Sequence, residues 1–461
     1  MTIKNNLLIL FIISTTIFAN EATNKKIEML QKQINALQSQ LLEIKQEATA
    51  SSIPVKTKAA IKKSQHAKKR SFRRKQSKNL QFYAKPVTTS AIWGVISEYD
   101  GSDLIVSYSS MNQDLMLLKH RAKGYWRNGK NNINSPSIQL SGALEAQASF
   151  EKFTDSTNSD INLSTFELDV LAEINPWVSA LASINYNDSA TAELDRTKHS
   201  SLYLKRAFIT LGKLKKSKLY STVGQLYMPF GRYSSLMLTS PIVVSMGRTT
   251  GRGAILGYYG IDTNNNGLNG SIYLMQAKTS TSKNINKLND FGLNANWTHN
   301  YSDTNNIQIG SSWTHNLADS DHIRVVLNDA DALHKLNKSL SGINFYTIIG
   351  IKDWRLGAEY TSALNNLIAD SVDYDRFSSI HLEIDKAFGS TAIPSNLFLS
   401  YDQSWNAQSI QLPKNSWSVG AYSHLWKNTL QALEFRHNNN YENNSDLINK
   451  NILLMQFGVY F

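Results

Sequence analysis

The chain has 461 residues, no cysteine and a formal net charge of +12. The absence of cysteine excludes disulfides, thiolate metal sites and a cysteine nucleophile. Eleven of the basic residues lie between Lys56 and Lys78, and the chain after this run carries equal numbers of basic and acidic residues. The charge therefore does not indicate a fold surface that binds nucleic acid.

The first 47 residues contain two predicted segments. Residues 1–19 combine Lys4, a short apolar run and a small residue at Ala19, which is typical of a cleaved secretory signal peptide. In residues 20–47, apolar positions alternate in spacings of three and four, which predicts a coiled-coil helix. It would join copies into a homo-oligomer of undetermined order, or remain a single amphipathic helix, because it holds fewer than three full heptads.

Two further segments precede the main domain. Residues 48–82 are predicted to be a basic flexible linker, because the run from Lys56 to Lys78 has too little apolar content to fold. This basic run either contacts an anionic surface such as peptidoglycan or serves as a solvated spacer. Residues 83–136 are too apolar for a linker and show no clean strand pattern. We assign them to the periplasmic mouth or the lumen.

From residue 137 onward the sequence alternates between apolar and polar residues in segments of about ten to fifteen residues, which predicts β-strands. We expect sixteen of them, at residues 137–152, 161–174, 177–188, 200–212, 217–227, 252–262, 267–278, 289–300, 305–315, 340–350, 352–363, 375–387, 394–403, 414–425, 428–437 and 449–461.

The connections between these strands alternate between short turns and longer loops. Asn175-Pro176 is a short turn, whereas Met228 to Gly251 and Asn316 to Ser339 are long links. Sorting of loop length by barrel end, together with export, is typical of Gram-negative outer-membrane barrels. The sequence therefore predicts that residues 137–461 form a 16-stranded antiparallel porin-like barrel in contact with outer-membrane lipid.

The C-terminal strand ends on Phe461, and the residues at Val459 and Phe457 continue the same apolar face. This strand must pair with the first one if the barrel closes. A terminal phenylalanine on an alternating strand also resembles the signal that the barrel-assembly machinery reads in outer-membrane proteins. We therefore expect Phe461, Val459 and Phe457 to form an assembly signal.

The third long link contains the candidate substrate site. Porins commonly fold their third external loop into the lumen, and rings of basic residues favour anions in such constrictions. We expect Arg232, Arg248 and Arg252 to line this constriction, with Lys205 and Arg206 on the strand before it. Alternatively, these side chains stand in solvent or pair with carboxylates at the rim.

Two identical tetrapeptides, Trp297–Asn300 and Trp313–Asn316, each contain a histidine. In the predicted strand order they fall at opposite rims, so we interpret them as interfacial tryptophans followed by polar residues, and not as a metal site. Serine and histidine are plentiful, but no local signature of a barrel lipase or protease surrounds them. We therefore predict no catalytic residues, no metal and no cofactor.

Several collinear fragments resemble the LbtU-type siderophore porins. They include Glu173–Val178, Arg206–Gly212, Met228–Gly231, Asn316–Asp321 and Ala358–Leu364, and the order of signal peptide, coiled coil and barrel is also similar. The resemblance implies uptake of an anionic ferric siderophore of the polycarboxylate type. Residues 79–136 are too few for the plug domain of energy-coupled receptors. The alternative is a general or anion-selective porin that also tethers the envelope through the basic linker.

Overall fold

The computed structural model describes residues 81–84, 118, 136–153, 156–187, 201–262, 266–279, 287–302, 304–369, 372–389, 393–426, 428–441 and 449–461. The predicted signal peptide, coiled coil and basic linker run lie outside the described residues, as does nearly all of the segment 83–136. Among the described residues, no helix is long and apolar enough to cross a membrane.

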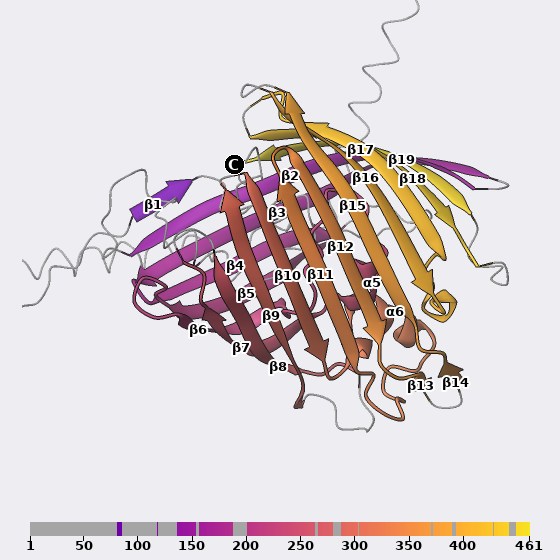
Figure 1. The fold of residues 1–461 in the computed structure, drawn as a ribbon, viewed down its shortest axis with the longest axis horizontal. Coiled ribbons are helices and arrows are strands. Elements are labelled where there is room, and N and C mark those ends of the chain that lie inside the picture. The colour runs from indigo at the N-terminus through magenta and orange to yellow at the C-terminus, as the bar shows by residue number, and fades with distance from the viewer. Residues whose placement is uncertain are drawn as a thin grey trace, which may run out of the picture. The chain divides into compact units, whose positions relative to one another are not determined.

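Sixteen antiparallel strands form a closed barrel (Figure 1). In chain order they are β2 (Ser137–Lys152), β3 (Thr157–Asn175), β4 (Val178–Asn187), β5 (Ser201–Gly212), β6 (Leu219–Tyr227), β7 (Thr250–Tyr259), β8 (Gly267–Gln276), β9 (Leu288–Ser302), β10 (Asn305–Thr314), β11 (Gly342–Ile351), β12 (Trp354–Ala363), β15 (Ser378–Gly389), β16 (Pro394–Trp405), β17 (Asn415–Ser423), β18 (Thr429–Asn439) and β19 (Lys450–Tyr460). Each of the sixteen predicted strands overlaps one of them, which confirms the predicted fold class.

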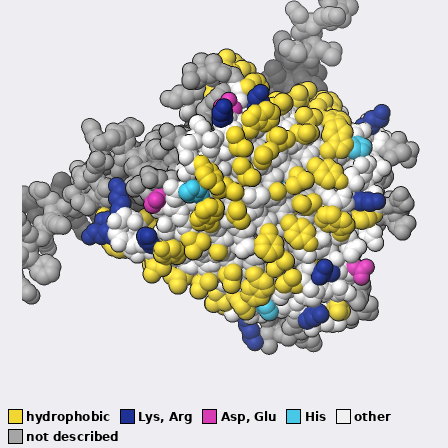
Figure 2. Space-filling model, in the orientation of Figure 1, with side chains coloured by type: hydrophobic (Ala, Val, Ile, Leu, Met, Phe, Trp, Pro, Cys, Tyr) yellow, Lys and Arg dark blue, Asp and Glu magenta, His cyan; other side chains and the backbone are white. Residues whose placement is uncertain are grey.

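Side chains alternate between the two faces of the wall. On β2, Ser141 and Glu145 are buried on the inner face, whereas Leu140 and Leu144 are exposed on the outer face. Apolar side chains cover much of the visible outer wall, and most Lys and Arg side chains in view lie around its margins (Figure 2). The sequence alternates because one face of each strand meets an apolar environment and the other a polar interior.

Connection length separates the two ends of the barrel. Links such as Pro176–Trp177 and Lys352–Asp353 are short turns, and we name the end that contains them the turn end. The opposite end, named the loop end, carries the long links, although the four residues between β2 and β3 are an exception. The sorting of loop length is therefore a strong tendency and not a strict rule.

Phe461 closes the barrel beside β2. Its backbone N–H donates to the Gly142 oxygen at 3.0 Å, and the Gly142 N–H donates to the Phe461 oxygen at 2.7 Å. Phe461, Val459 and Phe457 are all exposed on the outer face. A short strand, β1 (Gln81–Ala84), pairs in parallel with Ser137–Leu140, the part of β2 that β19 leaves unpaired.

The longest links fill the loop end with their own apolar core. The link from β6 to β7 contains α5 (Ile242–Gly247), and the link from β10 to β11 contains η2 (Leu317–Asp319) and α6 (Asp321–Asp329). The strands β13 (Leu367–Ala369) and β14 (Val372–Tyr374) and the helix η3 (Gln408–Ile410) come from two other links. Buried side chains from all of these links belong to a single cluster, which therefore joins the loops to one another.

The two repeated tetrapeptides lie on the neighbouring strands β9 and β10. Trp297 pairs with Ile309 and Trp313 pairs with Leu293, so the register separates the two tryptophans along the wall. Each histidine stacks on a local aromatic ring, His299 on Trp297 and His315 on Phe291. The register agrees with the interpretation that the repeats belong to opposite rims.

Candidate functional site

Residues 228–249, which we name the inner loop, lie in the lumen and contact the wall opposite their own strands. Nearly all of these side chains are buried, including Met228 and Phe230. The loop leaves β6, and its Gly231 N–H donates to the Ser312 hydroxyl of β10 at 3.1 Å. The third long link therefore folds inward.

Four wall carboxylates hold the backbone of the inner loop, and we name them the carboxylate clamp. They are Glu359 on β12, Glu383 on β15, Asp402 on β16 and Glu434 on β18. All four are buried. Buried carboxylates require hydrogen-bond donors, and here backbone N–H groups of the loop supply several of them.

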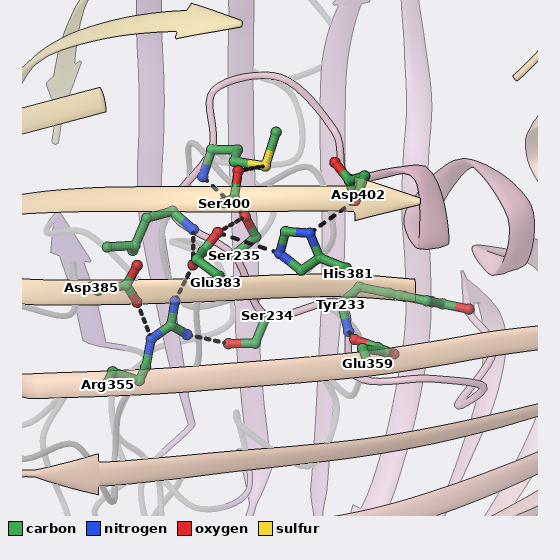
Figure 3. Close-up of polar contacts among 12 residues, drawn as sticks. Tyr233, Ser234, Ser235, Arg355, Glu359, His381, Glu383, Asp385, Ser400 and Asp402 are labelled. Atoms are coloured by element: carbon green, nitrogen blue, oxygen red, sulfur yellow. Dashed lines mark hydrogen bonds and ion pairs between the residues drawn. The ribbon is translucent and has the colours of Figure 1, made fainter. Parts of the chain in front are cut away.

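Successive carboxylates of the clamp bind successive residues of the inner loop. Glu359 accepts the N–H groups of Arg232 and Tyr233, both at 2.7 Å. Glu383 accepts the Ser235 hydroxyl at 2.5 Å and the Leu236 N–H at 3.0 Å. Figure 3 shows Tyr233, Ser234 and Ser235 beside these wall residues.

The second half of the loop is held in the same way. Glu434 accepts the N–H groups of Leu238 at 2.5 Å and Thr239 at 3.1 Å. Asp402 accepts the Ile242 N–H at 3.2 Å, at the first residue of α5. The clamp thus follows the loop from its entry into the lumen to its helix.

Basic wall residues compensate the charge of the clamp. Arg355 forms ion pairs with Glu383 and Asp385 and donates to the Ser234 hydroxyl at 2.9 Å. His381 lies between Asp402 at 2.9 Å and Glu383 at 3.4 Å, as Figure 3 shows. A buried ion pair costs desolvation energy, so these side chains fix one position of the loop more than they add net stability.

A β-bulge places two consecutive basic residues on the inner wall. The register between β4 and β5 shifts at Lys205, since Ser183 pairs with Arg206 and Ile184 pairs with Leu204. A bulge re-aims one side chain, so neighbours that would alternate can point to the same side. Lys205 and Arg206 both contact the inner-face carboxylate Glu167, Lys205 at 2.9 Å.

Arg248 joins this pair from the end of the inner loop. The guanidinium groups of Arg206 and Arg248 lie 5.8 and 5.5 Å from the centre of the Tyr227 ring. We name Lys205, Arg206 and Arg248 the basic cluster. The side chain of Arg248 has the largest exposed fraction of the three, 24%, against 11% for Lys205 and 4% for Arg206.

The environment keeps Arg248 charged. Burial acts to lower the pKa of its guanidinium, but Tyr227 and the Asp321 carboxylate outweigh burial and raise it. Asp321 also pairs with Arg324 at 3.3 Å, so this one carboxylate is shared by two guanidinium groups. Positive charge therefore remains at the end of the inner loop.

The structure places Arg232 and Arg252 apart from the basic cluster. Arg232 is half-buried at the start of the inner loop, where its backbone binds Glu359. Arg252 is exposed on the outer face of β7, on the same side as Leu256 and Tyr258, and its Nε donates to Gln225 at 3.3 Å. Strand alternation turns Arg252 away from the lumen, which corrects the expectation that it would line a constriction.

No family model matches the chain. The chain is 30% identical over 442 residues to a UPF0422 protein of Coxiella burnetii, an alignment that covers 94% of this chain and 88% of that protein. The chain belongs to the UPF0422 family. A UPF0422 protein of Legionella pneumophila (strain Philadelphia 1) is 29% identical over 377 residues, which is 77% of this chain and 70% of that relative.

Among solved structures, this UPF0422 protein is similar to the outer membrane channel DcaP of Acinetobacter baumannii and to an anion-selective porin from Comamonas acidovorans. Each is 11% identical with a TM-score of 0.46. The match to DcaP covers 72% of this chain and 99% of that chain, and the match to the Comamonas porin covers 71% and 100%.

Sequence reasoning did not identify the carboxylate clamp of this UPF0422 protein. A usable signal existed, because Glu359, Glu383 and Glu434 occupy inner-face positions of strands whose outer faces are apolar. Acidic residues at such positions need donors, and a loop in the lumen is a natural source of them. Their pairing with individual loop residues is a long-range property that strand periodicity does not contain.

Proposed function

We propose that the protein is an outer-membrane channel of a Gram-negative bacterium that admits small anionic solutes. The turn end would face the periplasm and the loop end the exterior, as the sorting of loop length in such barrels suggests. The apolar outer wall would contact outer-membrane lipid, and the polar inner wall would border the path. On this proposal the barrel is a channel and not an enzyme.

The observation that carries the anion preference is the basic cluster. Arg206 on the wall and Arg248 on the inner loop both lie against the Tyr227 ring, and Lys205 shares the Glu167 carboxylate with Arg206. Charge contacts weigh more in a narrow, partly desolvated passage than on an open surface. Because Glu167 compensates Lys205 and Arg206, the more exposed Arg248 is the residue expected to meet a passing anion.

The finer proposal is that the solute is a ferric siderophore of the polycarboxylate type. Its support is the resemblance of the sequence to LbtU-type siderophore porins and the anionic character of such complexes. The alternative is a general or anion-selective porin with a second role as an envelope tether through residues 56–78. Contacts with peptidoglycan, with the barrel-assembly machinery and between copies through the coiled coil remain predictions.

Ion selectivity in planar bilayers tests the channel proposal. The reversal potential across a KCl gradient should show anion preference for the wild type. Arg248→Gln should lower the anion-to-cation permeability ratio by about two- to fivefold, the effect of one charge screened by partial solvent exposure. Arg252→Gln is the matched control, because it removes the same charge from the outer face and should leave the ratio unchanged.

Three results would contradict this assignment. Equal reversal potentials for the wild type and Arg248→Gln would show that Arg248 of the basic cluster does not determine the ion selectivity of the channel. A protein that remains monodisperse without detergent would contradict the assignment as a membrane channel. A cation preference in the wild type would overturn the anionic solute class.

Growth under iron limitation tests the siderophore. A deletion strain would be complemented with the wild type, Arg248→Gln or Arg252→Gln, and supplied with its own siderophore or with free iron. A growth defect of the deletion strain that appears only with the siderophore supports uptake of that complex. Equal growth of the deletion strain and the wild type would contradict siderophore uptake and favour the general porin. Release of the protein from the cell wall after deletion of residues 56–78 would favour the role as an envelope tether.

A further inference from the structure

Three basic side chains gather at the loop-end rim, outside the basic cluster of the lumen. They are Arg252 on β7, Lys278 just beyond β8 and Arg324 on α6. Arg252 and Lys278 are exposed, and among the described residues neither has a carboxylate within salt-bridge distance. The channel mechanism uses neither of them.

Strand register places Arg252 and Lys278 on the same outer face. Gly253 pairs with Met275, so Arg252 lies level with Gln276, one step nearer the rim. Lys278 follows Gln276 by two residues, which returns a side chain to the same face and makes it a diagonal neighbour of Arg252. Below Arg252, the exposed apolar residues of β7 are Leu256 and Tyr258. On β7, Arg252 therefore lies on the rim side of the large exposed apolar residues, and Leu288 of β9 is exposed at the level of Gln276.

Asp319 links Lys278 to Arg324. The Lys278 backbone N–H donates to the Asp319 carboxylate at 3.0 Å, and Arg324 donates to the Asp319 backbone oxygen at 3.4 Å. Burial raises the pKa of the Asp319 carboxyl, which weakens it as a counter-charge. The other nearby carboxylate, Asp321, is already shared by Arg248 and Arg324.

Charges of both signs surround Lys278. Partial burial lowers the pKa of its ammonium group, Arg324 and Arg252 lower it further, and Asp321 and Asp319 oppose them. Neighbouring cations that repel one another are stabilised when they bind an anion with several oxygens, and a phosphate group has such oxygens. An anion held here would lie on the rim side of Leu256 and Tyr258, the large exposed apolar residues of β7.

We propose that Arg252 and Lys278, with Arg324 beside them, bind the phosphate groups of a phosphorylated lipid headgroup in the outer leaflet. This rests on the orientation in the proposed function, which turns the loop end outward. The apolar residues beneath Arg252 contact the acyl chains, and the basic residues contact the phosphates. The lipid thus holds this sector of the barrel at a fixed depth.

Binding of purified full-length protein in detergent to bis-phosphorylated lipid A tests the proposal, with the same lipid stripped of its phosphates as the second probe. The double variant Arg252→Gln/Lys278→Gln should bind lipid A about tenfold more weakly, as expected for two basic residues at a charged lipid surface. The wild type should lose affinity as salt is raised. Lys386→Gln, which removes an exposed cation beside Trp354 at the turn end, should bind like the wild type.

Unchanged lipid A affinity in the double variant overturns the proposal, as does equal binding of the dephosphorylated lipid, which would indicate acyl contacts alone. Inorganic phosphate that binds the rim as tightly as lipid A would show a free-anion site in place of a lipid site. The reversal potential of the double variant separates this proposal from the channel. Weaker lipid binding with unchanged ion selectivity in the double variant would show that the rim residues bind lipid independently of the channel. Lipid binding by a wild type that has no anion selectivity would contradict only the anion-channel proposal.

Discussion

The backbone N–H of Tyr233 donates a hydrogen bond of 2.7 Å to the carboxylate of Glu359, and this contact attaches the inner loop to a wall strand far from its own in the sequence. Glu359 also accepts the Arg232 N–H and the Asn344 side-chain amide. One buried carboxylate thus satisfies three donors, two of which belong to the loop. The position of the loop in the lumen depends on few such residues.

Replacing Glu359 should release the first part of the inner loop. Glu359→Ala leaves three donors without their acceptor, and each buried orphan costs about 1–3 kcal/mol. We expect a lower midpoint of thermal unfolding and a larger, noisier single-channel conductance. Glu151→Gln is the control, because Glu151 pairs with Lys450 and, among the described residues, forms no ion pair or hydrogen bond with the inner loop. An unchanged conductance in Glu359→Ala would show that the clamp does not set the width of the passage.

Arg355 should be far more sensitive to substitution than an exposed ion-pair partner. Arg355→Met leaves Glu383 and Asp385 without their guanidinium, and breaking a buried pair in this way costs about 3–5 kcal/mol. Lys335→Met, which breaks the exposed pair with Asp331, should change the free energy of unfolding far less, because solvent screens that pair. Unfolding in urea, followed by circular dichroism, compares the two. Similar midpoints would contradict the structural role of Arg355.

Gly142 should tolerate no larger residue, because Phe461 covers it. A Cβ at Gly142 would lie 2.5 Å from the Phe461 ring, whereas a Cβ at Gly357 would have its nearest neighbour at 3.9 Å. Gly142→Val should therefore reduce the yield of folded barrel, and Gly357→Ala should not. Heat-modifiable migration on gels measures the folded fraction. Comparing Gly142→Val/Phe461→Ala with Phe461→Ala alone tests the cause, because Phe461 is also part of the predicted assembly signal. If the ring is responsible for the clash, Gly142→Val should lower the yield much less in the Phe461→Ala background.

His424 should make the turn end less stable in mild acid. Burial lowers the pKa of its imidazole, and its Nδ1 lies 2.6 Å from the Thr429 backbone oxygen. A base with a lowered pKa in the folded state binds its proton more readily when unfolded, so stability falls as the pH drops through and below about 6.5. The thermal midpoint of His424→Asn should fall less than that of the wild type between pH 7.5 and 5. Parallel curves would exclude this residue as the cause.

The strands could be read from the sequence because their cause is local. Alternation along β2 or β19 requires only that one face meet an apolar environment, and each strand carries that pattern by itself. The face of a particular residue near a strand end is less certain, since a shift of one residue reverses it. The bulge at Lys205 brings two neighbours to the inner wall, whereas regular alternation places Arg252 on the outer one.

The candidate site was predictable only in part for a related reason. The inward course of the third link could be expected from the general behaviour of barrel loops, whereas the role of the basic residues in a constriction stays a prediction. The carboxylate clamp could not, because Glu383 and Leu236 meet through tertiary structure and no local pattern joins them. Acidic residues on inner faces indicate that donors must exist, but not which segment provides them.

The pairing of Phe461 with Gly142 also constrains the order in which the barrel can form. Until β19 pairs with β2, the edge of β2 along Ala143–Lys152 is open, and β1 covers only Ser137–Leu140. Such an edge can pair with any other extended chain, and contacts between distant residues form slowly. The interval before closure is thus the period of greatest risk of aggregation, and a partner that shielded this edge would protect every strand that follows.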